Sequence, residues 1–181
     1  MTRFGYIVLT CIPMLTASGL GFLHPPPRLI WNATASTPTG FYTLHPAGRL
    51  HALELVVVRL PEPVASFLTD GGFLPKNVPL LKHVMALPGQ TVCRSGNAVR
   101  VDDVDVGAAH DRDHLGRPLP RWSGCITLQP GEVFLMNPTV SDSLDGRYFG
   151  SLPVTSIVAR AVPLWTDEAG DGRFVWRAAT H

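Results

Sequence analysis

The sequence predicts a mainly β domain that follows a single membrane anchor. The 17 prolines and 17 glycines stand among valine, leucine and threonine, a composition that favours short strands joined by turns over a helix bundle. Residues 4–23 form a stretch of 20 residues without a charge, which is enough to cross a bilayer as a helix. The chain of 181 residues is otherwise long enough for one domain with a genuine core.

The anchor prediction divides the chain into three parts. Residues 1–23 form the anchor, residues 24–30 a stiff proline-rich spacer, and residues 31–181 the folded domain. Arg3 ahead of the apolar segment favours an amino terminus on the inner side of the membrane and a domain on its outer side. The alternative is a cleaved signal peptide, because Ala17-Ser18-Gly19 offers small residues near a processing site. We favour the anchor because the apolar run continues past them.

Apolar runs bounded by turn residues predict the strands of the domain. A short helix is expected at residues 63–70, because Pro63 suits a first helical turn and Gly71-Gly72 would end it. Residues 102–121 are polar and are expected to form a loop. The predicted strands lie at residues 53–60, 80–87, 91–93, 98–101, 126–128, 132–136 and 155–165.

Two short stretches carry candidate catalytic residues. Ser36 lies in a turn that Pro38 stiffens and Gly40 allows to bend. Lys82 lies in the apolar run 80–87, whose side chains would disfavour its charged form and lower its pKa. A serine hydroxyl becomes a good nucleophile when a base removes its proton, and a neutral lysine can be that base. The two stretches therefore predict a Ser36 nucleophile and a Lys82 general base.

His83 is the alternative base. Adjacent residues of a strand point to opposite faces, so Lys82 and His83 cannot both face the serine. No histidine of the chain lies in a recognisable Ser/His/Asp triad motif, and we therefore favour Lys82.

Other sites and partners are not indicated. His110, Asp111, Asp113 and His114 could be imagined as a metal cluster, but no helix brings them onto one face and a solvated loop is the simpler interpretation. We expect no metal and no cofactor. The formal net charge of +1 gives no electrostatic footprint for nucleic acid.

Two cysteines of the domain could form a disulfide. Cys93 and Cys125 lie beside predicted strands, in a compartment that permits disulfides. A bridge would close a loop of roughly 30 residues and add about 3 to 4 kcal/mol in the chain-entropy model. Two buried free thiols are the alternative, and we favour the bridge.

Three motifs stand in order along the chain: Ser36-x-Pro-x-Gly-Phe-Tyr, Lys82-x-Val-x-Ala-Leu-Pro-Gly and Asp145-Gly-Arg147-Tyr-Phe-Gly150. They resemble the conserved boxes of the Ser/Lys signal peptidases. The resemblance covers residues 30–165 and implies a signal-peptidase-like antiparallel β-sheet domain. A Gly-Arg-Pro-Leu-Pro run from Gly116, followed by Trp122-Ser123-Gly124-Cys125, is similar to the TraF-type branch, which matures pilin in conjugative transfer.

The resemblance also implies supporting residues. Thr34, two residues before the nucleophile, would bind the oxyanion together with the backbone N–H of Ser36. Ser143 would hydrogen-bond the lysine amine. Asp145 and Arg147 would pair and brace that region.

One stretch departs from the family pattern. Met136, Asn137 and Pro138 stand where the housekeeping signal peptidases carry Gly-Asp-Asn. We therefore transfer no role to these residues.

The resemblance implies a membrane-anchored serine endopeptidase that processes a conjugative pilin or another exported precursor. Its domain would lie in the periplasm, attached to the inner (cytoplasmic) membrane by a single pass. Water would release the acyl-enzyme, or a substrate amine would release it and cyclise the product. The expected partners are a membrane-borne precursor and the lipid bilayer, which the N-terminal helix would contact, and the enzyme is expected to be a monomer. A general type I signal peptidase and a non-catalytic envelope module are the alternatives. The short chain argues against the first, and the presence of both Ser36 and Lys82 argues against the second.

Overall fold

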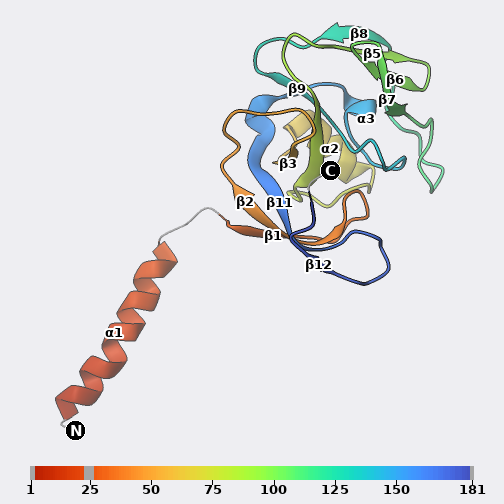
Figure 1. The fold of residues 1–181 in the computed structure, drawn as a ribbon. Helices are drawn as coiled ribbons and strands as arrows, with labels where there is room; N and C mark the ends of the chain where they lie inside the picture. The colour runs from red at the N-terminus through yellow and green to blue at the C-terminus, as the bar shows by residue number, and fades with distance from the viewer. Residues whose placement is uncertain (1–2, 23–26, 180–181) are drawn as a thin grey trace.

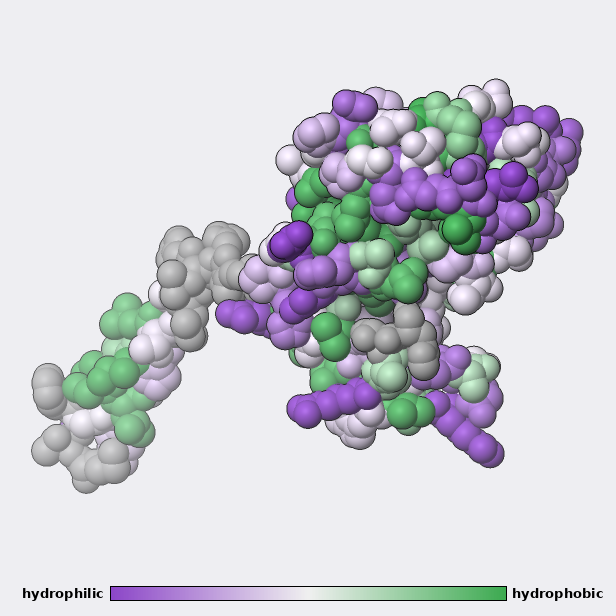
Figure 2. Space-filling model, turned by 45° about the horizontal axis from the view of Figure 1, so that its top comes forward, coloured by the Kyte–Doolittle hydropathy of each residue, from purple (hydrophilic) through white to green (hydrophobic). Residues whose placement is uncertain are grey.

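The computed structural model describes residues 3–22 and 27–179 and contains an N-terminal helix and a β domain (Figure 1). Helix α1 (Arg3–Phe22) projects away from the β domain and exposes apolar side chains such as Ile7 and Met14 (Figures 1 and 2). Within these described ranges, no helix combines the length and the apolar character that a membrane span requires. Residues 1, 2 and 23 of the predicted anchor and residues 24–26 of the predicted spacer lie outside the described residues.

The large sheet carries the serine and lysine motifs. Its central strand β3 is buried on both faces, as its apolar run predicts: Val57 packs into one core cluster and Val56 into another. Among the described residues, the sheet has eight strands, all paired antiparallel, and β12 pairs with β11 outside the main order. That order is β1 (Leu29–Asn32), β2 (Thr39–His45), β11 (Ile157–Asp167), β3 (Leu55–Val58), β4 (Leu80–Ala86), β9 (Glu132–Met136) and β10 (Leu152–Pro153), and β12 spans Val175–Trp176.

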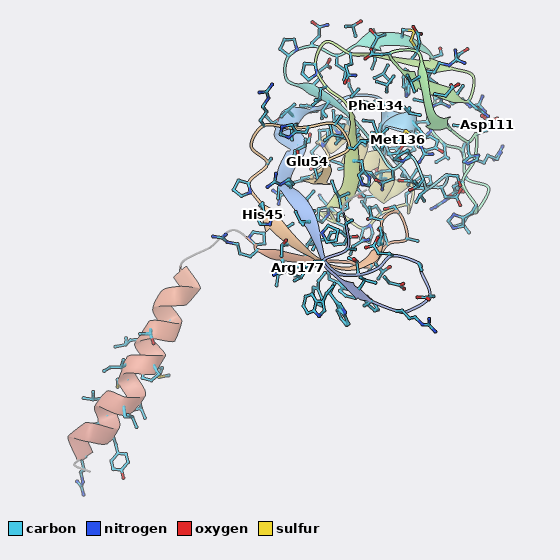
Figure 3. The ribbon with its side chains drawn as sticks, viewed as in Figure 1. His45, Glu54, Asp111, Phe134, Met136 and Arg177 are labelled. Atoms are coloured by element: carbon cyan, nitrogen blue, oxygen red, sulfur yellow. A yellow bond between two sulfur atoms is a disulfide. The ribbon has the colours of Figure 1, made fainter. Side chains whose placement is uncertain are left out.

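A small sheet packs over one end of the large sheet. Phe134 and Met136 of β9 lie in the core between the two sheets (Figure 3). Cys93 and Cys125 lie opposite each other on neighbouring strands and form a disulfide with an S–S distance of 2.03 Å. The predicted bridge is therefore confirmed, and the alternative of two free thiols is wrong. The small sheet has the order β7 (Val104–Ala108), β6 (Ala98–Val101), β5 (Thr91–Ser95) and β8 (Gly124–Thr127).

Short helices connect the strands. Helix α2 (Glu62–Asp70) confirms the predicted helix, with a proline in its first turn. Helix α3 (Gly146–Phe149) lies in the third motif, and a 3-10 turn, η1 (Val154–Ser156), leads into β11.

The loop predicted at residues 102–121 is wrong in its first part, because β7 pairs there with β6. Asp102 and Asp103, which form the turn between the two strands, both have positive φ values of 46° and 65°. Aspartate tolerates this left-handed region, which a tight hairpin turn requires. The polar Val-Asp-Asp-Val sequence therefore encodes a hairpin.

Candidate active site

The turn between β1 and β2 presents Ser36, and the side chain of Asn32 shapes it. Asn32 is buried, and its Nδ2 donates to the carbonyl oxygens of Thr34 at 2.9 Å and Pro38 at 3.1 Å. Its Oδ1 accepts from the backbone N–H of Thr34 at 3.1 Å. Gly40 is required where the turn enters β2, because a Cβ there would collide with the backbone of β11. One buried amide thus orders the backbone around the serine.

The hydroxyl of Thr34 lies beside the serine hydroxyl. Thr34 Oγ1 is 3.2 Å from Ser36 Oγ and donates to Asn32 Oδ1 at 2.8 Å. A threonine hydroxyl has one hydrogen, so Ser36 must be the donor in the contact between the two hydroxyls. Thr34 could donate to an oxyanion only after its hydroxyl rotates away from Asn32.

Lys82 lies on β4 with its amine enclosed. Only 2% of its surface is exposed, and Nζ donates to Ser143 Oγ at 2.7 Å. Burial lowers the pKa of Lys82 to about 8, although the nearby charge of Asp145 raises it. A large share of the amine is therefore neutral at mildly alkaline pH.

Ser36 and Lys82 line one cavity of about 270 Å³. Ser143 and Thr34 line it as well, so the structure brings the serine, the lysine and two of the supporting residues together. In the described part of the chain, no hydrogen bond joins the Ser36 side chain to the lysine amine. The hydroxyl of Ser36 contacts Thr34 instead, and the amine of Lys82 donates to Ser143. Apolar residues form much of the wall, namely Phe73, Leu74, Leu80, Val140 and Leu144.

His83 points to the other side of β4. It lines a separate cavity of about 350 Å³ with Leu55 and Glu168. Its Nδ1 lies 3.0 Å from Asn137 Oδ1, and burial lowers the pKa of His83. Burial therefore favours the neutral form of this histidine, and its side chain lines a different cavity from the serine.

The third motif contains a buried ion pair. Asp145 and Arg147 are 0% and 1% exposed, and two parallel N–H···O bonds of 2.9 Å join them. Arg147 Nη2 also donates to the carbonyl oxygens of Val140 and Ser143, at 2.6 Å and 3.1 Å. The pair therefore holds the backbone that carries the hydroxyl partner of Lys82.

The long connection between β7 and β8 contributes a charged pair to the cavity wall. Asp113 and Arg117 form a salt bridge of 2.6 Å, and both line the cavity. Arg117 Nη1 donates to Gly71 O at 2.9 Å, and its guanidinium lies 3.9 Å from the centre of the Phe73 ring. Asp113, one of the four residues of the imagined metal cluster, thus pairs with Arg117 and forms part of the cavity wall.

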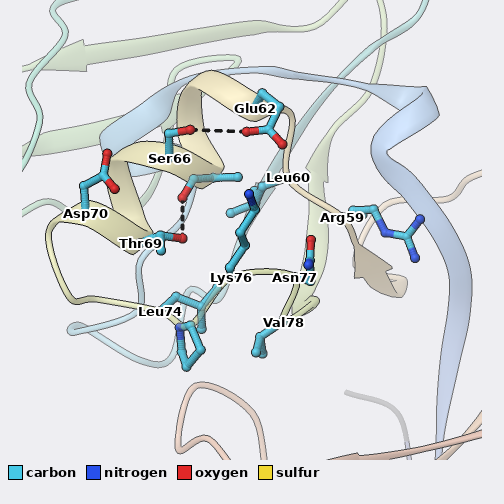
Figure 4. A pocket seen from close by; sticks show the side chains of 12 residues that line it. Arg59, Leu60, Glu62, Ser66, Thr69, Asp70, Leu74, Lys76, Asn77 and Val78 are labelled. Carbon is cyan, nitrogen blue, oxygen red and sulfur yellow. Dashed lines mark hydrogen bonds between the residues drawn. The ribbon is translucent and has the colours of Figure 1, made fainter.

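The other lysine of the chain lies outside the cavity that Ser36 and Lys82 line, which is the candidate catalytic cavity. Lys76 is exposed and lines a neighbouring pocket of about 160 Å³ between α2 and the loop that follows it (Figure 4). Leu74 lies between this pocket and the candidate catalytic cavity, because it lines both.

Two asparagines that the sequence did not point to hold backbone groups of the serine turn. Asn32 orders the serine turn, and Asn137 Nδ2 donates to the carbonyl of Ser36 at 2.6 Å. Asn137 is followed by a proline, which signals the end of β9. No local signal reveals its contact with a residue 101 positions earlier.

The chain is similar to known signal peptidases and transfer proteins. The family model "Signal peptidase, peptidase S26" matches residues 1–165. The plasmid transfer protein TraF of Escherichia coli is 31% identical over 145 residues, which cover 77% of this chain and 78% of that protein. A probable conjugal transfer protein TraF of Sinorhizobium fredii is 32% identical over 146 residues, covering 75% of this chain and 76% of that protein.

A solved structure also aligns with the chain. The crystal structure of a signal peptidase I from Enterococcus faecalis has a TM-score of 0.37 and 16% identity, and the alignment covers 62% of this chain and 96% of that one. The match of the family model over residues 1–165 and the identity to the two transfer proteins show the family. The chain belongs to the signal peptidase family, peptidase S26.

Proposed function

We propose that the chain is a serine endopeptidase in which Lys82 activates Ser36. The observation that carries this proposal is a buried lysine amine with a lowered pKa in the cavity that Ser36 lines. Membership of the peptidase S26 family supports it.

The chemistry follows from the positions of the side chains. Ser36 Oγ attacks the scissile carbonyl carbon while its proton passes to the neutral amine of Lys82. The backbone N–H of Ser36 and the hydroxyl of Thr34 donate to the oxyanion. Lys82 then gives its proton to the leaving amine as the carbon–nitrogen bond breaks, and an acyl-enzyme remains. Water, deprotonated by Lys82, hydrolyses the ester and restores Ser36.

The substrate that we propose is a pilin precursor of a conjugation system. The relatives are named as plasmid and conjugal transfer proteins, which supports a role in transfer. If an amine of the substrate replaces water at the acyl-enzyme, the product is a cyclic peptide. We infer small residues before the scissile bond from family analogy.

Mass spectrometry of the products tests this function. Purified full-length enzyme is incubated with pilin precursors from conjugation systems and, in parallel, with precursors of other exported proteins. We expect cleavage of a pilin precursor only, and a cyclised product is one water lighter than the linear one. Cleavage of every precursor would indicate a general signal peptidase. Cleavage of none would indicate a non-catalytic envelope module.

We also propose that the enzyme works at the periplasmic side of the inner membrane. The disulfide suits an extracytoplasmic domain, and apolar side chains of α1 are exposed. Aromatic rings, all exposed except that of the half-buried Phe174, gather where β1 follows the N-terminal segment, and indole prefers the headgroup zone of a bilayer. Their ring centroids lie 4.5–6.5 Å apart, and the residues are Trp31, Phe41, Trp165, Phe174 and Trp176.

The tryptophans provide a test of membrane contact. Trp122 is partly buried against the core below the small sheet and serves as the control. In full-length variants with a single tryptophan, brominated lipids should quench the fluorescence of Trp31 and Trp176 more strongly than that of Trp122. Equal quenching at all three positions would contradict membrane contact through this cluster.

A further inference from the structure

Asn137 contacts both halves of the active site. It follows the last residue of β9 and is 1% exposed. Its Nδ2 donates to Ser36 O at 2.6 Å and to Leu81 O at 3.0 Å. Its Oδ1 accepts from the backbone N–H of His83 at 3.3 Å and lies 3.0 Å from Nδ1 of the same residue. Both hydrogens and both lone pairs of the amide are therefore used.

The side chain of Asn137 takes the place of a peptide group in the sheet. β4 and β9 pair between His83↔Met136 and Ala86↔Phe134, so the earlier part of β4 has no β9 residue opposite it. There the amide of Asn137 accepts from the N–H of His83 and donates to the carbonyl of Leu81. A neighbouring antiparallel strand would bond the same two groups. The other hydrogen of the Asn137 amide is donated to the carbonyl oxygen of Ser36.

The strand order alone does not hold the serine turn against Lys82. The turn connects β1 and β2, while β11 and β3 stand between β2 and β4. Within the described residues, the bond from Asn137 to Ser36 O is the only hydrogen bond that joins residues 33–38 to β4 or to residues 137–147. Because Asn137 is buried, water has little access to replace this bond when the amide is removed.

We propose that Asn137 is a positioning residue that holds the carbonyl of Ser36 against β4 and so sets the distance between the nucleophile and its base. This inference rests on the proposed peptidase function. Asn137 makes no contact with the lysine amine, which bonds Ser143. Its loss should therefore move the serine and leave the environment of the lysine intact. A displacement of about 1 Å is enough to lower turnover about 100-fold.

The test compares Asn137→Ala and Asn137→Asp with Thr166→Val. Aspartate keeps the shape of asparagine but places a carboxylate oxygen where Nδ2 donates to the carbonyls of Ser36 and Leu81. Alanine removes the amide altogether. Thr166 is buried and hydrogen-bonded on β11 but does not line the catalytic cavity, so its variant controls for a general loss of stability. The assay follows cleavage of an internally quenched peptide with small residues before the scissile bond, from about pH 6 to about pH 10. The assay temperature is kept below the melting temperature of every variant.

Both Asn137 variants should lower kcat about 100-fold with KM within a few-fold of wild type. The alkaline midpoint of the rate should stay at the wild-type value in Asn137→Ala, because Lys82 remains buried, whereas the added carboxylate of Asn137→Asp should move the midpoint to higher pH. Thr166→Val should keep the wild-type kcat. His83→Ala removes one contact of the Asn137 amide, so it should lower kcat less than about tenfold and add nothing in the Asn137→Ala background.

Three results would overturn the proposal. The first is a wild-type kcat in both Asn137 variants. The second is a loss of kcat in Asn137→Ala together with a midpoint shifted to that of an exposed lysine, because the whole site would then have collapsed. The third is that neither variant folds, which would make Asn137 a structural residue. Failure of the wild-type enzyme to cleave any substrate would instead refute the peptidase function itself.

Discussion

Ser36→Ala and Lys82→Met should each lower the rate of precursor cleavage at least about a thousandfold. The first removes the oxygen that attacks the carbonyl, and the second removes the amine that takes its proton. Methionine has nearly the length of lysine and suits the buried site, so the wall of the cavity is retained. The rate is measured by gel or mass spectrometry on a co-purified precursor, and the double variant should be no worse than either single one.

Lys76→Met is the matched control for the lysine, because Lys76 is exposed and lies outside the catalytic cavity. It should cleave like the wild type. Normal cleavage by Ser36→Ala or by Lys82→Met would remove the basis of the Ser/Lys mechanism.

Lys82→Met should also be more stable than the wild type at pH 7. The pKa of Lys82 is about 8 in the folded protein and about 10.4 in the unfolded chain. At pH values between these two pKa values, the unfolded chain therefore binds more protons than the folded protein does. Wild-type stability therefore rises with pH across that window. Methionine abolishes this dependence and should add roughly 3 kcal/mol to the free energy of unfolding at pH 7.

Asp145→Asn should lower the free energy of unfolding by about 3 to 5 kcal/mol. The change leaves the guanidinium of Arg147 buried without a counterion, and both side chains are at most 1% exposed. The backbone N–H of Asn137, which donates to Asp145 Oδ2 at 3.1 Å, also loses a charged acceptor. Urea denaturation followed by circular dichroism gives the change in stability.

Asp105→Asn is the control for the buried pair. Asp105 and Arg100 also form an ion pair, but their side chains are 67% and 53% exposed. Its loss should therefore change stability by less than about 1 kcal/mol. Equal effects of the two substitutions would show that the buried pair does not brace the site.

The sequence predicted those elements whose signals are local. The apolar runs of β3 and β4, the proline and glycine boundaries of α2, and the short strands β5 and β6 were all recognisable. The hairpin of β6 and β7 was missed, because acidic residues in its turn and strand suggested a loop. Strand β2 was missed as well, although its residues alternate between buried and more exposed in the structure. It begins directly after Pro38 and contains Gly40, and these two residue types indicate a turn.

The motif residues could be identified from the sequence, whereas the residues that arrange them could not. Ser36, Lys82 and Ser143 belong to motifs, and the structure places them in one cavity. Asn32 and Asn137 act through hydrogen bonds to backbone groups, and such contacts leave no pattern in the sequence. The contact between Asn137 and Ser36 exists only once β9 has paired with β4.

The pKa of Lys82 tests the central claim most directly. The chain contains two lysines, so NMR of enzyme labelled with carbon-13 at lysine Cε gives two signals, and Lys76→Arg assigns them. We predict that Lys82 titrates with a pKa of about 8 and that the cleavage rate rises along the same curve, because the neutral amine is the base. Titration of Lys82 at the ordinary value of about 10.4, with a cleavage rate that does not follow it, would contradict the account.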